Sequence, residues 1–458
     1  MGSAPFDSVL DMVGNTPMVK LTRFFKGARC TVLGKCDFMN PAGSVKDRIG
    51  RNMVERAEQA GLIKPGGTIV EATAGNTGLG LCIAAAVKGY KVVCCTPDKM
   101  SQEKINLMRA FGARVVVTPT VAKEDPRSYT SMAKKIASET PNALYIAQFE
   151  NDANPESHYL TTGPEIWEQT EGKLNVFVAS SGTGGTLKGA GKYLKEQNEA
   201  VKIVLADPDG SVYAHYSRHK NLDVESASYK VEGIGNDYLP KTIDLDHIDH
   251  AYTVTDRESF NASRRLALTE GLFCGGSSGT NLVAAMRYIK EFDPDEDVTI
   301  VVFLCDTGER YLSKIYNDDW MRENQFMPES SVGITAADLL LEKQANSPAL
   351  ITATPDTPVA DVFAQIKSLD ISQVPVIENG HVVGALNENQ VLDLLMQGKA
   401  LTELVVRDVM GAALASVEPS ATVQQMLGLM REHAQDAVMV KQGESFDILT
   451  KFDLLRAL

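Results

Sequence analysis

The sequence of 458 residues is 44% hydrophobic, which is enough for a sizeable core spread over two or three domains. The formal net charge is −14 and no long basic run occurs, which argues against nucleic acid and acidic membrane surfaces as partners. The N-terminal segment lacks a cationic region followed by an apolar core, and no apolar run reaches the length of a membrane span, so we expect a cytoplasmic protein.

Between residues 7 and about 318, short apolar runs alternate with longer amphipathic ones. Units of strand, loop and helix are predicted at residues 67–89, 90–113 and 175–197, and further strands at residues 114–119, 202–210 and 297–309. Strands that are apolar throughout are typical of sheets buried on both faces. The alternation therefore predicts an α/β domain in which helices cover both faces of mostly parallel sheets.

A polar segment with Pro328 follows Trp320 and has no clear periodicity, so we predict a linker there. We place the domain boundaries at residues 1–322, 323–334 for the linker, and 335–458. The last region contains an internal repeat, in which residues 348–395 and 405–458 both predict a strand, a helix, two strands and a final helix. Its size suits a ligand-sensing or dimerising module.

Two loops of the first region place glycines between a predicted strand and a predicted helix. Glycines in Ser180–Thr186 let backbone N–H groups approach an anion, which the helix N-terminus also attracts. The patterns GxxxxGK[ST] and GxGxxG are absent, so a ligand with one phosphate is expected there, or else a tight turn without a ligand. The loop Thr73–Gly78 offers Asn76 to a ring oxygen and further donors to a carboxylate, although a plain helix cap is the alternative.

Lys46 lies between a flexible turn and the first turn of a predicted helix. A free lysine is mostly protonated at neutral pH, but as an imine with an aldehyde cofactor it becomes an exchangeable covalent tether. Asp47 and Arg48 are expected to pair outward from the same helix. From spacing alone, a solvated surface lysine is the favoured interpretation.

Four motifs favour a cofactor-binding Lys46 over a surface lysine: "NPAGSVKDR", "TAGNTG", "SSGTGGT" and "GLFCGGSSG". In this order they resemble the fold-type II pyridoxal-phosphate enzymes of the cysteine synthase and cystathionine β-synthase family, over about residues 7–318. The resemblance implies a catalytic domain of two doubly wound lobes with pyridoxal phosphate in the cleft. It also implies a homodimer.

The resemblance assigns roles to residues that match the family's motifs. Lys46 would form the Schiff base and then move protons at Cα and at the leaving group, and Ser277 would meet the pyridine nitrogen. The remaining cofactor residues would be Asn76 at the 3′ oxygen and Gly182, Thr183, Gly184, Gly185 and Thr186 at the phosphate. Thr73, Gly75, Asn76, Thr77, Gln148 and Gly233 would bind the substrate. Ala74 replaces the family's usual serine, so one hydroxyl donor for the substrate is missing.

The family's reaction is a β-replacement, and two substrate pairs are open. The segment of residues 229–240, with Glu232 before Gly233, resembles the branch that joins serine to homocysteine, and Glu232 would assist the second substrate or proton movement. An exposed loop glutamate is the alternative. Phe149 stands where that branch often has tyrosine, which favours O-acetylserine-dependent synthesis of cysteine or cystathionine instead. Hydrogen sulfide formed from cysteine, a serine- or threonine-deaminating lyase, and an adenosyl sensor with an inactive catalytic domain are further possibilities.

The C-terminal repeats resemble a tandem of CBS repeats, or Bateman module, which is typical of the serine-using branch. Thr450 and Asp453 match ribose-contacting residues of such modules, whereas Asn387 and Gln390 stand in their places in the first repeat. The resemblance implies at most one adenosyl site, with S-adenosylmethionine as a hypothetical regulator and a purely dimerising role as the alternative.

Seven cysteines at irregular spacing, without CxxC or a Cys/His cluster, predict reduced thiols and no metal site. Some vertebrate relatives carry a haem-binding extension before the catalytic domain. Only a few residues precede the first motif here, so no haem is expected.

Overall fold

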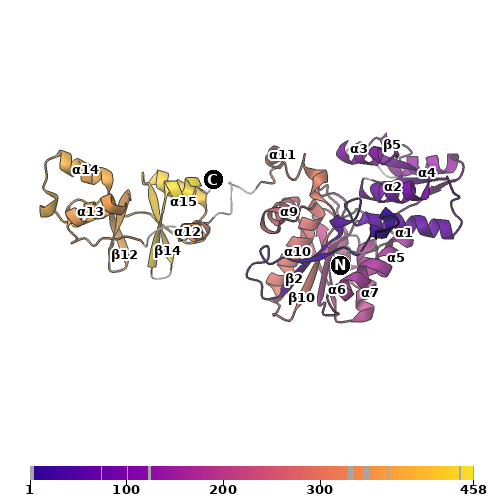
Figure 1. Ribbon diagram of the computed structural model, residues 1–458, viewed down its shortest axis with the longest axis horizontal. Helices are drawn as coiled ribbons and strands as arrows, with labels where there is room; N and C mark the ends of the chain where they lie inside the picture. The colour runs from indigo at the N-terminus through magenta and orange to yellow at the C-terminus, as the bar shows by residue number, and fades with distance from the viewer. Residues whose placement is uncertain are drawn as a thin grey trace. The chain divides into compact units, whose positions relative to one another are not determined.

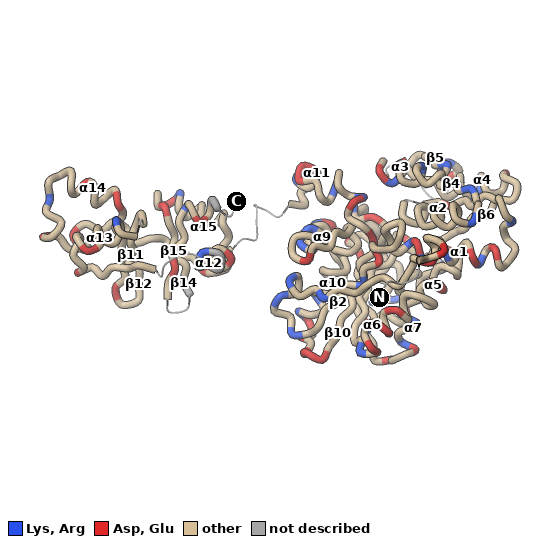
Figure 2. Tube along the Cα trace, in the orientation of Figure 1, with Lys and Arg blue, Asp and Glu red and all other residues tan. Residues whose placement is uncertain are grey.

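The computed structural model describes residues 5–73, 75–98, 100, 102–121, 125–327, 335–344, 350–369, 371–442 and 445–456. Contacts divide the chain into two compact units, Met1–Met327 and Pro328–Leu458 (Figure 1). Acidic and basic positions are interspersed along both units (Figure 2). None of the described helices is long and apolar enough to cross a membrane.

The first unit contains a larger, six-stranded sheet. Its order is β1 (Met18–Lys20), β2 (Thr31–Cys36), β10 (Thr299–Leu304), β7 (Val176–Ser180), β8 (Lys202–Pro208) and β9 (His250–Val254), parallel throughout except for β1. Alternate residues of β7 enter different cores: Val176 and Val178 pack towards α9 (Asp256–Glu270) and α10 (Gly276–Phe292). Phe177 and Ala179 pack on the other face with α6 (Gly163–Gln169), α7 (Gly185–Gln197) and α8 (Tyr213–His219).

A smaller, fully parallel sheet forms the second lobe of this unit. Its order is β5 (Arg114–Thr118), β4 (Lys91–Pro97), β3 (Thr68–Ala72) and β6 (Ala143–Tyr145). One face is covered by α1 (Lys46–Gln59), α2 (Asn76–Lys88) and α3 (Gln102–Ala110), and the other by α4 (Tyr129–Glu139) (Figure 1). The predicted two-lobed α/β architecture is therefore confirmed.

Shorter elements complete the first unit: η1 (Val9–Met12), η2 (Asp37–Met39), α5 (Ala153–Ser157), the π-helical η3 (His158–Thr162), η4 (Gly308–Tyr311) and α11 (Asp318–Glu323). The predicted linker at 323–334 begins inside this packing, because Phe326 stacks 5.2 Å from Phe260 and the Arg257 guanidinium donates to the Gln325 carbonyl. Residues 328–334 lie outside the described residues.

The second unit contains two sheets, and its elements follow the repeated order expected from the sequence. The first repeat comprises α13 (Val359–Leu369), antiparallel β11 (Gln373–Glu378) and β12 (His381–Asn387), and α14 (Glu388–Met396). The second comprises β13 (Ser416–Val417), α15 (Val423–Glu432), β14 (Ala437–Gln442), β15 (Ser445–Thr450) and α16 (Lys451–Arg456). The strand predicted at the start of the first repeat is reduced to a bridge between Ala353 and Val376.

Three further helices join the repeats to one another: α12 (Ala336–Gln344), η5 (Leu401–Glu403) and η6 (Val406–Asp408). Leu339 and Leu340 of α12 pack in the core of the second repeat. Val406, which the sequence places at the start of the second repeat, packs in the core of the first. The core of each repeat therefore includes a segment that adjoins the other repeat in sequence.

Candidate active site

A cavity of about 780 Å³ lies between the lobes of the first unit, at the carboxyl ends of β3 and β7. Parallel α/β sheets collect ligands at such strand ends. The cavity brings together every described residue to which the sequence assigned a catalytic, cofactor or substrate role. They are Lys46, Thr73, Gly75, Asn76, Thr77, Gln148, Gly182, Thr183, Gly184, Gly185, Thr186, Glu232, Gly233 and Ser277. Ala74 lies outside the described residues.

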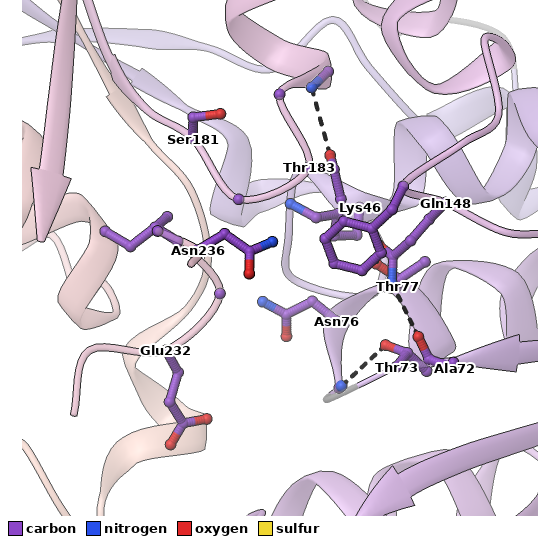
Figure 3. Close-up of a pocket in the computed structure, with 18 of the residues that line it drawn as sticks. Lys46, Ala72, Thr73, Asn76, Thr77, Gln148, Ser181, Thr183, Glu232 and Asn236 are labelled. Carbon is purple, nitrogen blue, oxygen red and sulfur yellow. Dashed lines mark hydrogen bonds between the residues drawn. The ribbon is translucent and has the colours of Figure 1, made fainter. Parts of the chain in front are cut away.

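Lys46 is the first residue of α1 and projects into this cavity (Figure 3). Its backbone is fixed from two sides. The Val45 N–H donates to the Cys305 carbonyl at 2.9 Å, and a Cβ on Gly80 would lie 2.3 Å from the Lys46 carbonyl oxygen. Only a glycine at position 80 lets α1 and α2 approach this closely. The surrounding protein desolvates the Lys46 amine and lowers its pKa, which Cys305 and Asp306 only partly offset. A lower pKa leaves more of the amine unprotonated at neutral pH, and only the unprotonated amine attacks an aldehyde.

The expectation that Asp47 and Arg48 pair outward is wrong, because both are 2% exposed. The Arg48 guanidinium donates to Asp37 at 2.7 and 2.8 Å and to Glu165 at 2.6 and 2.8 Å. Lys35 donates to Glu165 at 2.6 Å. Two cations and two carboxylates neutralise one another in this buried cluster, as burial of charge requires. The cluster anchors α1 immediately after Lys46.

The loop before α7 forms a cradle whose donors fit a phosphate. A Cβ on Gly182 would lie 2.3 Å from the Gly233 carbonyl oxygen, and Gly184 has a φ of +93° with Ile243 2.4 Å from the Cβ position. The N-cap of α7 is Gly184, which has no side chain to cap the first turn, and the Gly185 N–H donates to the Thr183 hydroxyl at a long 3.5 Å. The buried Ser181 hydroxyl has no hydrogen-bond partner among the described residues. The Thr183 hydroxyl accepts from Asn154 at 2.9 Å, which leaves its own proton free to donate.

Asn76 and Ser277 also line the cavity. The Asn76 amide nitrogen donates to Asp306 at 2.8 Å, and its oxygen accepts from Arg310. These bonds fix the orientation of the amide and leave its second N–H able to donate into the cavity. In Figure 3 the side chains of Lys46, Asn76 and Asn236 extend into the same space. Ser277, the second residue of α10, is buried beside Cys305 and gives the cavity a neutral hydroxyl.

The expected substrate residues form a connected group at the end of β3. The Thr77 hydroxyl donates to Gln148 Oε1 at 2.6 Å, and the Thr73 hydroxyl accepts from the Gly75 N–H at 3.1 Å. Gly75 has a φ of +152°. Behind them burial raises the pKa of Glu71 to about 8, which the backbone amides of Gln148 and Ala147 offset only in part. Glu71 is therefore mostly protonated at neutral pH.

Glu232 lies at the opening of the cavity between two lysines. Its carboxylate pairs with Lys104 of α3, across the cleft, and with Lys314 at 2.7 Å. Lys104 also lies 4.7 Å from the ring centre of Tyr311. Burial alone would raise the pKa of Glu232, but the two ammonium groups outweigh it and hold the pKa below its usual range. Glu232 is thus a carboxylate shared by two cations that links the lobes, rather than an exposed loop residue.

Sequence analysis missed several residues of this site. Asp306, Arg310 and Tyr311 follow the carboxyl end of β10, so the rule that ligands collect at strand ends could have found them. Asn236 and Tyr238 also line the cavity, within a segment in which only Glu232 and Gly233 were singled out. Lys104 gave no signal, since a lysine in an amphipathic helix is usually solvated.

The expected regulatory residues belong to the second unit. The Thr450 N–H and hydroxyl donate to Asp453 Oδ2 at 2.8 and 2.9 Å, and Asp453 N–H donates back to the Thr450 hydroxyl. Lys343 of α12 donates to the same carboxylate oxygen at 2.7 Å. Although burial alone would raise the pKa of Asp453, Lys343 and the Thr450 donors lower it. The carboxylate of Asp453 is therefore held by the cap of its own helix and by Lys343.

All seven cysteines lie in the described part of the chain and are free thiols, and six of them are buried. Among the described residues, no group of three or more His, Cys, Asp or Glu side chains is placed to hold a metal ion.

Comparison with known proteins gives matches in both units. A family model described as pyridoxal-phosphate dependent enzyme matches residues 9–306, and one described as CBS domain matches residues 343–397 and 406–458. Cystathionine beta-synthase from Dictyostelium discoideum is 37% identical over 98% of this chain and 91% of its own length. Cysteine synthase 1 from Neurospora crassa is 42% identical over 69% of this chain and 84% of its own length. A hydrogen sulfide-producing enzyme from Fusobacterium nucleatum, known from its crystal structure, shares 34% identity at a TM-score of 0.62, covering 67% of this chain and 98% of that one.

Proposed function

Because the chain belongs to the pyridoxal-phosphate dependent enzyme family, we propose that its cavity holds pyridoxal phosphate and joins L-serine to L-homocysteine, giving L-cystathionine and water. The observation that carries this proposal is the convergence of a desolvated lysine, a glycine cradle with open N–H groups and a buried serine hydroxyl in one cavity. Cystathionine beta-synthases are 37–41% identical to this chain over most of its length, which supports the substrate pair.

Different residues of the cavity would bind different parts of the cofactor. Lys46 would hold the cofactor at its aldehyde carbon, and Asn76 would donate to the ring oxygen. The phosphate would be held by Gly182, Thr183, Gly184, Gly185 and Thr186. Ser277 offers a neutral hydroxyl to the ring nitrogen, which leaves that nitrogen unprotonated and favours β-elimination over transamination. When bound, the cofactor supplies an electron sink that stabilises negative charge at the substrate Cα.

Binding the amino acid would release the Lys46 amine, which then acts as a base at Cα and carries the proton towards the leaving oxygen. Thr73, Gly75, Asn76, Thr77 and Gln148 bind the substrate carboxylate, and Gly233 lines the substrate space. The Cβ–O bond of serine breaks, and the hydroxide leaves as water with the proton that Lys46 took from Cα. A Cβ–S bond to homocysteine then forms, and the proton of the thiol returns through Lys46 to Cα. Because Glu232 is ionised, we assign it electrostatic assistance at the cavity opening rather than proton donation.

O-acetylserine is the second candidate substrate, in a cysteine or cystathionine synthesis. Two observations favour it: the identity to a cysteine synthase, and Phe149, which lines the cavity without a hydroxyl. Acetate leaves more readily than hydroxide, so this substrate needs less acid assistance. Cysteine in place of serine would release hydrogen sulfide, and the similar enzyme from Fusobacterium nucleatum is named for that product.

A product assay tests the proposal. We expect cystathionine from serine and homocysteine, with a larger kcat/KM for serine than for O-acetylserine when each is paired with homocysteine and with sulfide. A larger kcat/KM for O-acetylserine would replace the proposal with its alternative. Ammonia release without any thiol would indicate a deaminating lyase, and a colourless protein without bound cofactor would indicate an inactive catalytic domain.

For the second unit we propose one adenosyl site at Thr450 and Asp453, with S-adenosylmethionine as the first ligand to test. Calorimetry on the full chain should give heat that Asp453→Asn abolishes, and no heat from any adenosyl compound would leave a dimerising role. A cytoplasmic homodimer without haem remains our expectation. Sedimentation tests the dimer, and a Soret band that persists after cofactor removal would contradict the absence of haem.

A further inference from the structure

His158 lies behind the phosphate cradle and has no role in the function proposed above. It begins the five-residue π-helical turn His158–Thr162, which interrupts the helical run from Ala153 to Gln169. Such turns occur frequently at functional sites. The side chain is buried, with 1% of its surface exposed. Its two ring nitrogens face two hydroxyls: Nδ1 lies 2.9 Å from Thr162 Oγ1, and Nε2 lies 3.3 Å from Thr186 Oγ1.

The helix that carries Thr186 is packed directly against this turn. A Cβ on Gly189 of α7 would lie 2.0 Å from the Pro155 carbonyl oxygen and 2.8 Å from His158 Cβ. On the other side of the contact, a Cβ on Gly163 would lie 2.7 Å from Tyr193 Cβ. Glycine at positions 163 and 189 therefore brings α7 and the π-helical turn into close contact. Neither His158 nor Thr186 can shift far without moving the other.

The imidazole is neutral, because burial and the positive charge of Arg48 lower the pKa of His158 to about 3. A neutral ring has one donor and one acceptor nitrogen. If the proton is on Nε2, the Thr186 hydroxyl accepts it and keeps its own proton for a ligand in the cavity. If the proton is on Nδ1, Nε2 takes the proton of Thr186, which then cannot donate to a ligand. The Thr186 hydroxyl can therefore donate to a ligand in the cradle with the Nε2–H tautomer, but not with the Nδ1–H tautomer.

We propose that His158 is a positioning residue whose Nε2–H holds the Thr186 hydroxyl so that its proton points at the cofactor phosphate. Thr162 completes the chain by donating to Nδ1, which selects this tautomer. The inference rests on the proposed cofactor site, because it requires an anion at the start of α7. Hydrogen bonds to a charged group are among the stronger ones, so loss of this one should weaken cofactor binding about tenfold.

Long-range ¹H–¹⁵N NMR of the protein with its cofactor tests the tautomer directly. The signals of His158 are identified by their loss in His158→Gln, among the seven histidines of the chain. We expect the neutral Nε2–H tautomer between pH 6 and 8. The Nδ1–H tautomer would overturn the proposal, and so would an imidazolium. The tautomer itself is read on the unsubstituted chain, and the substitution serves only to identify the signals of His158.

Matched substitutions test whether the hydrogen bonds from Thr162 through His158 to Thr186 support cofactor binding. The amide nitrogen of glutamine can replace Nε2–H, whereas asparagine reaches only the place of Nδ1. We expect His158→Asn and Thr186→Val each to raise the cofactor dissociation constant about tenfold and to shift the ³¹P resonance of the bound phosphate. The double variant should be no worse than either one, and His158→Gln should stay within about threefold of the unsubstituted chain.

The outcomes separate the two proposals. A wild-type dissociation constant and ³¹P resonance in His158→Asn, while Thr186→Val is impaired, would overturn the role of His158 and leave the cofactor site standing. Additive losses in the double variant would do the same. If Thr186→Val binds the cofactor as tightly as the unsubstituted chain, the phosphate cradle itself is misassigned, and the inference falls with it.

Discussion

Three helices of the first unit that begin at the cavity differ at their N-termini from two helices of the second unit. In the first unit, α2, α7 and α10 open onto the cavity, and their N-caps are Gly75, Gly184 and Gly275, without a capping side chain. In the second unit, α14 and α15 begin with full capping boxes at Asn387 and Thr422. A first turn without a cap has unsatisfied N–H groups. At the cavity, three helices of the first unit therefore begin without a side-chain cap from the N-cap residue, whereas α14 and α15 of the second unit are capped by their own side chains.

The two repeats of the second unit carry similar helix caps at corresponding positions, one of them at Thr450 and Asp453. Gln390 and Asn387 exchange the same pair of hydrogen bonds as Asp453 and Thr450, so the geometry is conserved while the residues differ. What changes is charge, since Asp453 is an anion held by Lys343. In the structure the Thr/Asp pair is a helix cap whose carboxylate also pairs with Lys343.

The largest effect is expected from Lys46→Ala. Loss of the tether and of the base at Cα should lower kcat/KM by at least about 10⁴-fold, with the protein still folded. Steady-state kinetics and the absorbance of the bound cofactor measure this. The control is Lys88→Ala, which removes a lysine of α2 that pairs with Glu58. Equal kinetics for the two variants would remove Lys46 from the reaction.

Glycine substitutions should have opposite consequences in the two units. Gly184→Ala places a Cβ against Ile243 at a φ of +93°, so we expect the cofactor dissociation constant to rise by about 5- to 150-fold, on the scale of 1–3 kcal/mol for backbone strain. Gly428→Ala meets open space on α15 and should stabilise that helix by about 1 kcal/mol. Cofactor titration and denaturant unfolding check the pair. Tight cofactor binding by Gly184→Ala would show that the cradle does not hold the phosphate.

Buried carboxyl groups should give the two units opposite pH dependence. The pKa of Glu71 is raised from 4.5 to about 8, so the folded state binds more protons and the free energy of unfolding falls as pH rises through that window. Glu71→Gln should remove this slope and gain on the order of 4 kcal/mol relative to the unsubstituted chain between pH 5 and 9. Asp453, with a lowered pKa, should instead lose its contribution as pH falls below about 4.

Denaturant unfolding at several pH values measures these slopes. The matched variant Asp453→Asn should remove only the fall in the free energy of unfolding below about pH 4. A difference between Glu71→Gln and the unsubstituted chain that does not vary with pH would mean that Glu71 is ionised in the folded protein.

The smallest effect concerns Lys343. Its ion pair with Asp453 is partly exposed, with 24% and 18% of the two side chains accessible, so it contributes at most about 1 kcal/mol. Lys343→Ala should therefore tighten adenosyl binding by up to about fivefold, because the ligand no longer displaces an ammonium group. Calorimetry on the full chain measures this change. Weaker binding in Lys343→Ala would mean that the lysine contacts the ligand instead.

Much of this fold could be predicted from the sequence, because apolar strands and glycine loops are local signals. The loop Ser180–Thr186 and the loop Thr73–Gly78 both lie where strand ends predict a ligand site. The environment of Arg48 could not be predicted, since its partners Asp37 and Glu165 lie 11 and 117 residues away in sequence. Lys104 and His158 were missed for the same reason: Glu232 and Thr186, with which they pair, lie in other elements and approach them only in the folded chain.

Reduction of the protein with borohydride, followed by peptide mass mapping, tests the central claim most directly. It fixes the cofactor irreversibly to the amine that carries it. The account predicts a single cofactor adduct on the peptide that contains Lys46, and its loss in Lys46→Ala. An adduct on Lys104 or on any other lysine, or no adduct on a protein that forms cystathionine, would contradict it.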